Sequence, residues 1–272
     1  MNDRSPLQTT IPAAAGVVDA NQDSAQVLSA NATGGSFYSP TFFGYGFSQQ
    51  GSSHIEGGIP CQDANAVRIV SSKAGQHVIT AIADGLGSCV MSHAGSLTAV
   101  LTATSHCENA LKSSNLLSDQ EILAEMKMAF SKAWDAIEEQ ALAMNQLPFS
   151  FYTTLTLTIY DGEKLHIGHI GDGGVVAMFR SGRIALVTKR NKGDTATSVY
   201  PLQSGEDNWQ FFTLKEPVIG FAAATDGVLD SFVKSETYGN LVYEPFLTDF
   251  LFRYITTEQQ AMDAARQMDA FL

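Results

Sequence analysis

Three aspartates in this sequence have the same local setting, and that setting is the one best suited to chemistry. Asp84, Asp172 and Asp226 each follow an apolar, strand-like run and each precede a glycine. An ionised carboxylate at the end of a buried strand costs several kcal/mol unless a cation or a set of hydrogen bonds compensates it. Hard divalent cations prefer oxygen ligands. The pattern therefore predicts carboxylates gathered around divalent metal ions, the alternative being three ordinary turns.

Composition limits the classes of function. The chain has 272 residues, of which 44% are apolar and 16% charged, which suits one large domain or two small ones. The net charge of −12 argues against nucleic acid or an anionic membrane as the main partner. An acidic chain with clustered aspartates can hold divalent cations, although most of its acids are expected to be solvated surface groups.

The cysteines and the termini indicate the compartment. Cys61, Cys89 and Cys107 are an odd number and form no Cys-x-x-Cys pair, so neither a disulfide framework nor a zinc site is expected. Residues 1–20 show no signal peptide, and no apolar run reaches the length that spans a bilayer. A cytoplasmic location is the prediction.

The hydrophobic pattern predicts an α+β fold in which antiparallel strands and helix pairs form layers. Residues 1–39 are predicted to be a flexible leader before a domain at 40–272. A polar loop is expected at 52–60 and a surface flap at 189–208. The expected strands are 42–48, 64–70, 78–83, 153–160, 164–170, 175–179, 183–188, 210–214 and 218–225, and the expected helices are 92–107, 118–144, 240–255 and 257–271.

Two of these elements carry specific signals. Ser118 and Glu121 have the spacing of a capping box at the start of the helix 118–144. That helix should bury one apolar face, which consists of Ile122, Met126, Ala129, Phe130, Ala133, Ile137 and Ala141. The strand 153–160 alternates threonine with leucine or isoleucine, so one face should be buried and the other polar.

The motifs resemble a known family. They are Gly-Ile-Pro-Cys-Gln-Asp-Ala-Asn at 58–65, Ala-Asp-Gly-Leu-Gly at 83–87, Ile-Gly-Asp at 170–172 and Ala-Thr-Asp-Gly-Val-Leu-Asp at 224–230. Taken in this order, they resemble the metal-dependent PP2C-like (PPM) protein phosphatases, in particular the bacterial branch, over about residues 42–271. The resemblance implies a PP2C-like β-sandwich of two antiparallel sheets, flanked by helix pairs, with a dinuclear Mn²⁺ or Mg²⁺ centre at one end.

The resemblance also implies roles for individual residues in that centre. Asp84 matches the carboxylate that bridges both metal ions, and Gly85 matches the glycine whose carbonyl is a ligand. Asp63 matches a residue that binds metal or a metal-bound water, so Asp63 and Asp84 are the predicted catalytic residues. Asp226 matches a ligand of the first metal. Two cations about 4 Å apart would neutralise a phosphoryl group and lower the pKa of the water between them.

A third, weaker metal site is implied as well. Asp172 and Asp230, together with Asp226, match the ligands of that site in bacterial members. Each has an ordinary alternative: Asp172 could be a hairpin residue, and Asp230 could be a first-turn acid favoured by the helix dipole.

The sequence departs from the family pattern in three places. Family members usually carry a further metal-binding Asp near the C-terminus, whereas this chain stops shortly after Asp269, which is not assigned as that ligand. Either the native protein is longer or the site is incomplete. The phosphate-binding Arg of many eukaryotic members corresponds to Gly58, with His54 nearby, and their His after Asp-Gly is Leu86 here. The general acid is therefore unassigned.

The predicted function is that of a metal-dependent Ser/Thr phosphoprotein phosphatase in which a metal-bridging hydroxide hydrolyses phosphomonoesters. Its partner would be a phosphorylated protein, such as a Ser/Thr kinase or its substrate, in bacterial signalling. The alternative is a PPM-like pseudophosphatase or phosphoprotein-binding module with little hydrolysis. A thiolate phosphatase is disfavoured because six residues, not five, separate Cys61 from Arg68. His166 and His169 point to opposite faces of a strand and are expected to be structural.

Overall fold

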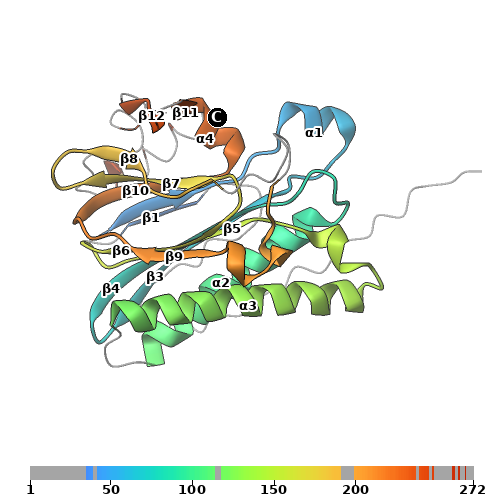
Figure 1. The fold of residues 1–272 in the computed structure, drawn as a ribbon, viewed down its shortest axis with the longest axis horizontal. Helices are drawn as coiled ribbons and strands as arrows, with labels where there is room; N and C mark the ends of the chain where they lie inside the picture. Colours follow the sequence, from blue (N-terminus) through green and yellow to red (C-terminus); the bar gives the residue numbers. More distant parts are fainter. Residues whose placement is uncertain are drawn as a thin grey trace, which may run out of the picture.

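A five-stranded antiparallel sheet with the strand order β3-β4-β5-β6-β9 forms the centre of the molecule (Figure 1). This computed structural model describes residues 35–38, 42–113, 118–190, 199–236, 239–244, 247, 259–260, 263 and 267. The strands of the central sheet are β3 Asp63–Ser72, β4 Gly75–Asp84, β5 Leu155–Tyr160, β6 Leu165–Ile170 and β9 Gln210–Thr213. Tight turns join β3 to β4 and β5 to β6, as the hairpin pattern predicted.

A three-stranded antiparallel sheet with the order β10-β7-β8 packs on one face of the central sheet. Its strands are β7 Gly174–Phe179, β8 Ile184–Leu186 and β10 Val218–Ala224. Between the two sheets lies an apolar cluster that includes Val78, Ile167, Val175, Phe179 and Val218. The two sheets therefore form a sandwich whose interior is filled by alternate side chains of each strand.

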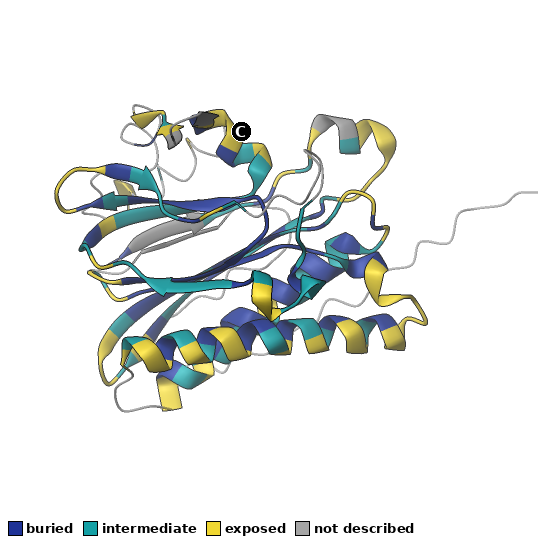
Figure 2. Cartoon of the chain, in the orientation of Figure 1, coloured by how far each residue is buried: buried dark blue, intermediate teal, exposed yellow. Residues whose placement is uncertain are grey.

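Two long antiparallel helices cover the other face of the central sheet (Figure 1). They are α2 Ser92–Ser113 and α3 Asp119–Ala143. Figure 2 shows their sheet-facing sides buried and the outer side of α3 exposed. The layered α+β arrangement confirms the predicted PP2C-like sandwich. The short helix α4 Asp226–Phe232 packs near the second sheet, where Leu229 and Phe232 join Val176 and Ile184 in a separate apolar cluster.

The predicted start of α3 is confirmed. The Ser118 side chain accepts a hydrogen bond from the backbone N–H of Glu121, and the Glu121 carboxylate accepts one from the Ser118 N–H at 2.8 Å. All seven residues of the predicted apolar face are buried. This helix was predictable because its cap and its 3.6-residue period are both local signals.

β5 was predicted to have one buried and one polar face; its threonine face is polar, but it is buried as well, since all six residues of the strand are buried. β5 is the middle strand of the central sheet, with helices on one face and the second sheet on the other. Its threonines are instead satisfied inside the sandwich: Thr158 bonds Thr80 at 2.6 Å, and Thr156 bonds Nδ1 of His169 at 2.8 Å. His166 bonds Thr213 on the opposite face, so both histidines have the structural partners that were expected.

Two further predictions need correction. Residues 52–60 are not all loop: Ser52–Gly57 form the short helix α1, which ends at Gly58 in the left-handed conformation. A helix does not begin at Asn240, because β12 Gly239–Val242 pairs with β11 Val233–Glu236 as a hairpin. The two strands are close in sequence, and the apolar pattern of the segment did not reveal that they pair. Most of the two predicted C-terminal helices, including Asp269, lies outside the described residues, and Gln259, Gln260, Asp263 and Gln267 have helical backbone.

The predicted leader and the predicted flap are described only in part. Residues 35–38 form β1 Gly35–Tyr38, which pairs with β2 Phe43–Gly46, and the remainder of 1–39 lies outside the described residues. In the segment 189–208, residues 191–198 are also outside them. Leu202 is fully buried, and its carbonyl accepts a hydrogen bond from the Trp209 indole, so this end of the segment belongs to the core.

Candidate metal centre

Asp63 and Asp84 lie directly opposite each other on neighbouring strands. Asp63 is the first residue of β3, Asp84 is the last residue of β4, and the two are Cα partners in the antiparallel register. Directly opposite side chains on one face of an antiparallel pair have Cβ atoms about 5 Å apart. The register of one hairpin therefore places two carboxylates together at the end of the central sheet.

Two other segments bring further carboxylates to the same place. Asp172 lies in the turn between β6 and β7, and Asp226 is the first residue of α4. One carboxylate oxygen from each of Asp84, Asp172 and Asp226 lies within 4.8 Å of the other two. The three aspartates that the sequence singled out thus converge in space, although 142 positions separate the first from the last.

Burial and the neighbouring negative charges raise the pKa of two of these carboxyl groups, Asp84 and Asp63. Burial is the largest cause that raises the pKa of Asp84 to about 8, and the negative charges of Asp63, Asp226 and Asp172 add to it. Burial, followed by the charge of Asp226, raises the pKa of Asp63 to about 6. Without a cation, the charged form of the cluster is therefore unfavourable, and a divalent cation bound among these oxygens would relieve the repulsion.

The donor atoms fit a hard divalent cation. Oδ1 of Asp63 is buried, and no hydrogen-bond partner reaches it among the described residues, whereas the Thr225 side chain bonds the same carboxylate. A buried carboxylate oxygen without a partner is a costly feature in a protein that binds nothing there. A set made entirely of oxygens suits Mg²⁺ or Mn²⁺ and does not suit the thiolate-preferring metals.

The backbone around Asp84 is held by the chain that precedes β5. The Asp84 N–H donates to the Thr154 hydroxyl at 2.9 Å, and the Asp84 carbonyl accepts from the Thr153 hydroxyl at 3.0 Å and from the Thr154 N–H at 2.8 Å. Gly85 follows where α2 comes very close, since a Cβ on Gly85 would lie 2.7 Å from backbone atoms of Ser92. Glycine is therefore needed at this position because α2 packs directly against it. The absence of a side chain would also let a bound ion approach the backbone closely.

Sequence reasoning missed the residue that connects these parts. Gln62 is buried; its side chain donates to the Ser92 hydroxyl at 2.7 Å, and its carbonyl accepts from the Ser96 hydroxyl at 2.6 Å and from the Gly85 N–H at 3.0 Å. It ties the start of β3, the end of β4 and the first turn of α2 together. Its place next to Asp63 in the motif was the available signal.

Asp230 has a different environment from the other predicted ligands. Its carboxylate oxygen Oδ1 accepts a hydrogen bond from Nη1 of Arg190 at 2.5 Å, and it is absent from the group of three carboxylates that converge. His54 is close enough for its charge to oppose the rise of the Asp63 pKa. Of the predicted ligands, the structure brings Asp63, Asp84, Asp172 and Asp226 together and places Asp230 beside them in an ion pair.

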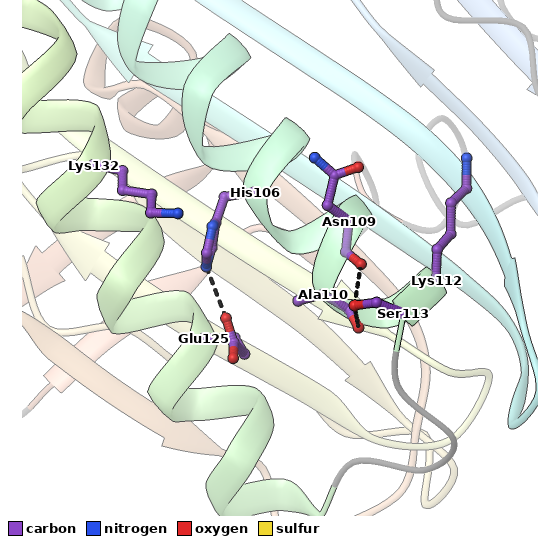
Figure 3. A pocket seen from close by; sticks show the side chains of 7 residues that line it. All are labelled: His106, Asn109, Ala110, Lys112, Ser113, Glu125 and Lys132. Atoms are coloured by element: carbon purple, nitrogen blue, oxygen red, sulfur yellow. Dashed lines mark hydrogen bonds and ion pairs between the residues drawn. The ribbon is translucent and has the colours of Figure 1, made fainter.

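A separate cavity of about 600 Å³ lies between α2 and α3, away from these carboxylates (Figure 3). Its lining includes the ion pair between His106 and Glu125, at 2.8 Å, and Lys132. It contains no part of the carboxylate cluster, so the cavity and the candidate metal centre are distinct features.

Comparison with known proteins identifies the family. The sequence profile described as "Protein phosphatase 2C" matches residues 50–272, which is most of the chain. The chain belongs to the protein phosphatase 2C family. Serine/threonine-protein phosphatase 3 of Escherichia coli (strain K12) is 26% identical over 220 residues, which cover 78% of this chain and 83% of that protein.

Solved structures show the same PP2C fold. The serine/threonine phosphatase Stp1 from Staphylococcus aureus matches 92% of this chain and 93% of its own, with a TM-score of 0.54 and 10% identity. The S. agalactiae serine/threonine phosphatase matches 82% of this chain and 90% of its own, with a TM-score of 0.53 and 14% identity. Within the part of this PP2C chain that the structure describes, no helix is both long and apolar enough to cross a membrane.

Proposed function

We propose that Asp63, Asp84 and Asp226, with Asp172 beside them, hold two divalent cations with which this metal-dependent Ser/Thr protein phosphatase hydrolyses phosphomonoesters. The observation that carries the assignment is the convergence of Asp84, Asp172 and Asp226 to within 4.8 Å from three distant segments. Asp63, which faces Asp84 across the β3–β4 pair, supplies a fourth carboxylate. Mn²⁺ and Mg²⁺ are the proposed ions, since both prefer oxygen ligands.

In this proposal the carboxylates of the protein hold the two cations in position. The cations would neutralise the phosphoryl oxygens and lower the pKa of bound water, so that no covalent phosphoenzyme is required. The charge of Asp84 interacts with those of Asp63, Asp172 and Asp226, which indicates that Asp84 lies at the centre of the cluster. The main-chain carbonyl of Gly85 is the proposed additional ligand.

The substrates are phosphoproteins. A Ser/Thr kinase or the target of one, within a bacterial signalling system, is the proposed specific partner. The three cysteines are free, which fits a cytoplasmic location where thiols stay reduced. The pseudophosphatase alternative is not favoured, because the family match and the curated relative are phosphatases.

The test is hydrolysis of a phosphothreonine peptide and of p-nitrophenyl phosphate with added Mn²⁺. We expect turnover that EDTA abolishes and that Mn²⁺ restores. Asp84→Asn should lower kcat/KM by on the order of 10²–10³-fold, because it removes a carboxylate that would hold the cations. The matched control is Asp135→Asn, an exposed carboxylate on α3, which should leave turnover unchanged.

Two outcomes would contradict the assignment. Turnover that persists in EDTA would exclude the metal mechanism. Full activity of Asp84→Asn would show that the cluster is not the metal centre, even if the protein is a phosphatase. Isothermal titration with Mn²⁺ on the same two variants separates a loss of metal binding from a loss of catalysis.

A further inference from the structure

The side chain of Arg190 is buried beside the carboxylate cluster and joins two of its segments. Its Nε donates a hydrogen bond of 2.5 Å to the main-chain carbonyl of Asp172, and its Nη1 donates one of 2.5 Å to the carboxylate of Asp230. Only 10% of the Arg190 side chain is exposed, compared with 55% for Asp230. A buried guanidinium needs a counter-charge, and Asp230 supplies it.

The geometry of α4 explains why a cation lies at this place. Asp226 and Asp230 are four positions apart on the helix, so their side chains lie on the same face. That face meets the turn that carries Asp172, because Asp172 and Asp226 belong to one cluster and Arg190 connects Asp172 to Asp230. The Asp230 carboxylate and the main-chain carbonyl of Asp172 therefore lie beside the proposed dinuclear centre, and the guanidinium of Arg190 bridges them.

The properties of the Arg190 guanidinium oppose the binding of a metal ion at the same position. It stays protonated at any physiological pH, it is planar and rigid, and it presents several donors at once. Here Nε and Nη1 are engaged, and Nη2 is buried with no hydrogen-bond partner among the described residues. A metal ion bound by Asp230 and the Asp172 turn would have to displace this group and meet its positive charge at close range.

We propose that the guanidinium of Arg190 is a built-in cation that replaces a third metal ion in this chain. In this inference Asp230 is the counter-ion of Arg190 rather than a metal ligand, and the centre binds two ions only. Arg190 is a positioning residue: it holds the Asp172 turn against α4, and it sets the number of ions without touching substrate. The inference rests on the proposed metal centre of the preceding subsection.

The test is a count of bound Mn²⁺ ions, by isothermal titration and by the electron paramagnetic resonance signal of free Mn²⁺. The wild-type chain should bind two ions. Arg190→Gln removes the charge and releases Asp230, so it should bind three. The double variant Arg190→Gln/Asp230→Asn should bind two again, because the released carboxylate is then absent.

Two single variants are controls. Arg183→Gln removes an arginine of the exposed β7–β8 turn, where it pairs with Glu216, and this variant should bind two ions. Asp230→Asn alone should also bind two ions, because Asp230 is not a ligand. This variant keeps the test informative if Arg190→Gln does not fold, which a circular dichroism melt would reveal.

The failures of the two proposals are distinguishable. Two ions in both the wild type and Arg190→Gln would overturn this inference and leave the dinuclear centre intact. A third ion in the wild type, lost in Asp230→Asn, would also overturn it. Absence of Mn²⁺ binding in the wild type would overturn the metal centre itself, and this inference with it.

Discussion

At the scale of single residues, the proposed chemistry depends on a fold that holds the carboxylates of Asp63, Asp84, Asp172 and Asp226 close together despite their mutual repulsion. Burial and the neighbouring charges raise the pKa of Asp84 to about 8. A carboxyl group whose pKa is higher in the folded state than in the unfolded chain stabilises the fold at low pH. This contribution is lost as the pH rises through about 8. Above that pH the metal-free protein is therefore destabilised by buried carboxylates that repel one another, and bound metal ions would remove this destabilisation.

The first prediction concerns that destabilisation. In EDTA at pH 8.5, Asp84→Asn should stabilise the protein against urea by about 1–3 kcal/mol, because it removes a buried charge that lacks a counter-ion. With saturating Mn²⁺ the order should reverse, since only the wild type keeps its full ligand set. Asp135→Asn should match the wild type in both conditions. Equal stabilities of Asp84→Asn and the wild type in EDTA would contradict the proposed repulsion.

His169 makes the opposite contribution to the pH dependence. It is fully buried between the sheets, where its Nδ1 bonds Thr156. Burial, assisted by the charge of Arg190, lowers the pKa of His169 to about 4. Because the unfolded chain takes up this proton near pH 6.5, the stability from a neutral His169 is present above that pH and is lost as the pH falls toward 4.

The second prediction follows from this shift. Between pH 7 and pH 4, the free energy of unfolding of the wild type should fall by roughly 3 kcal/mol more than that of His169→Gln, which has no proton to gain. Urea titrations of both proteins in EDTA at a series of pH values give the difference. Parallel curves for the two proteins would show that His169 is not buried in its neutral form.

At the scale of elements, the N-terminal half of α2 must approach other backbone very closely to support the centre. Gly85 faces Ser92, and a Cβ on Gly95 would lie 2.0 Å from the carbonyl oxygen of Phe151. The backbone of residues 150–154 in turn bonds Asp84, Leu86 and Met91. Small residues in this region let one helix support both the end of β4 and the start of β5.

The third prediction tests that contact. Gly95→Ala should destabilise the protein by about 1–3 kcal/mol, because backbone atoms of Phe151 cannot move aside cheaply. In an exposed helix interior the same change would stabilise by up to about 1 kcal/mol. Gly227→Ala in α4 is the control, since open space surrounds the position of its Cβ, and it should be neutral or stabilising. Thermal melts of both variants measure the effects.

At the scale of the whole molecule, the centre joins segments that are far apart in the chain. The β3–β4 pair, the β6–β7 turn and α4 each contribute carboxylates. The β3–β4 pair belongs to the central sheet, the β6–β7 turn connects the central sheet to the second sheet, and α4 follows β10 of the second sheet. Ions bound there would link the two layers of the sandwich, so metal binding and global stability should be coupled.

The fourth prediction is a metal-dependent melting temperature. Mn²⁺ at about 100 times its dissociation constant should stabilise the fold by about 2.7 kcal/mol per site. For a domain of this size, each kcal/mol corresponds to roughly 2–4 °C. Differential scanning calorimetry with Mn²⁺ and then excess EDTA measures the rise and its reversal. A melting temperature that does not depend on Mn²⁺ would mean that no ion binds the native state.

The sequence by itself determined the local features of this protein. It located the capping box and apolar face of α3, most of the strands, and the three strand-terminal aspartates, because periodicity, caps and Asp-Gly pairs lie within a few residues of each other. Family resemblance then joined the motifs into one predicted centre. Neither source indicated that Arg190 reaches Asp230, since nothing local links these two positions.

Only the tertiary structure decided which of these features face each other. The burial of both faces of β5 and the roles of Gln62 and Arg190 all depend on contacts between segments distant in sequence. Such contacts form because layers must cover one another's apolar faces, and this requirement acts on the folded molecule rather than on any short stretch of chain.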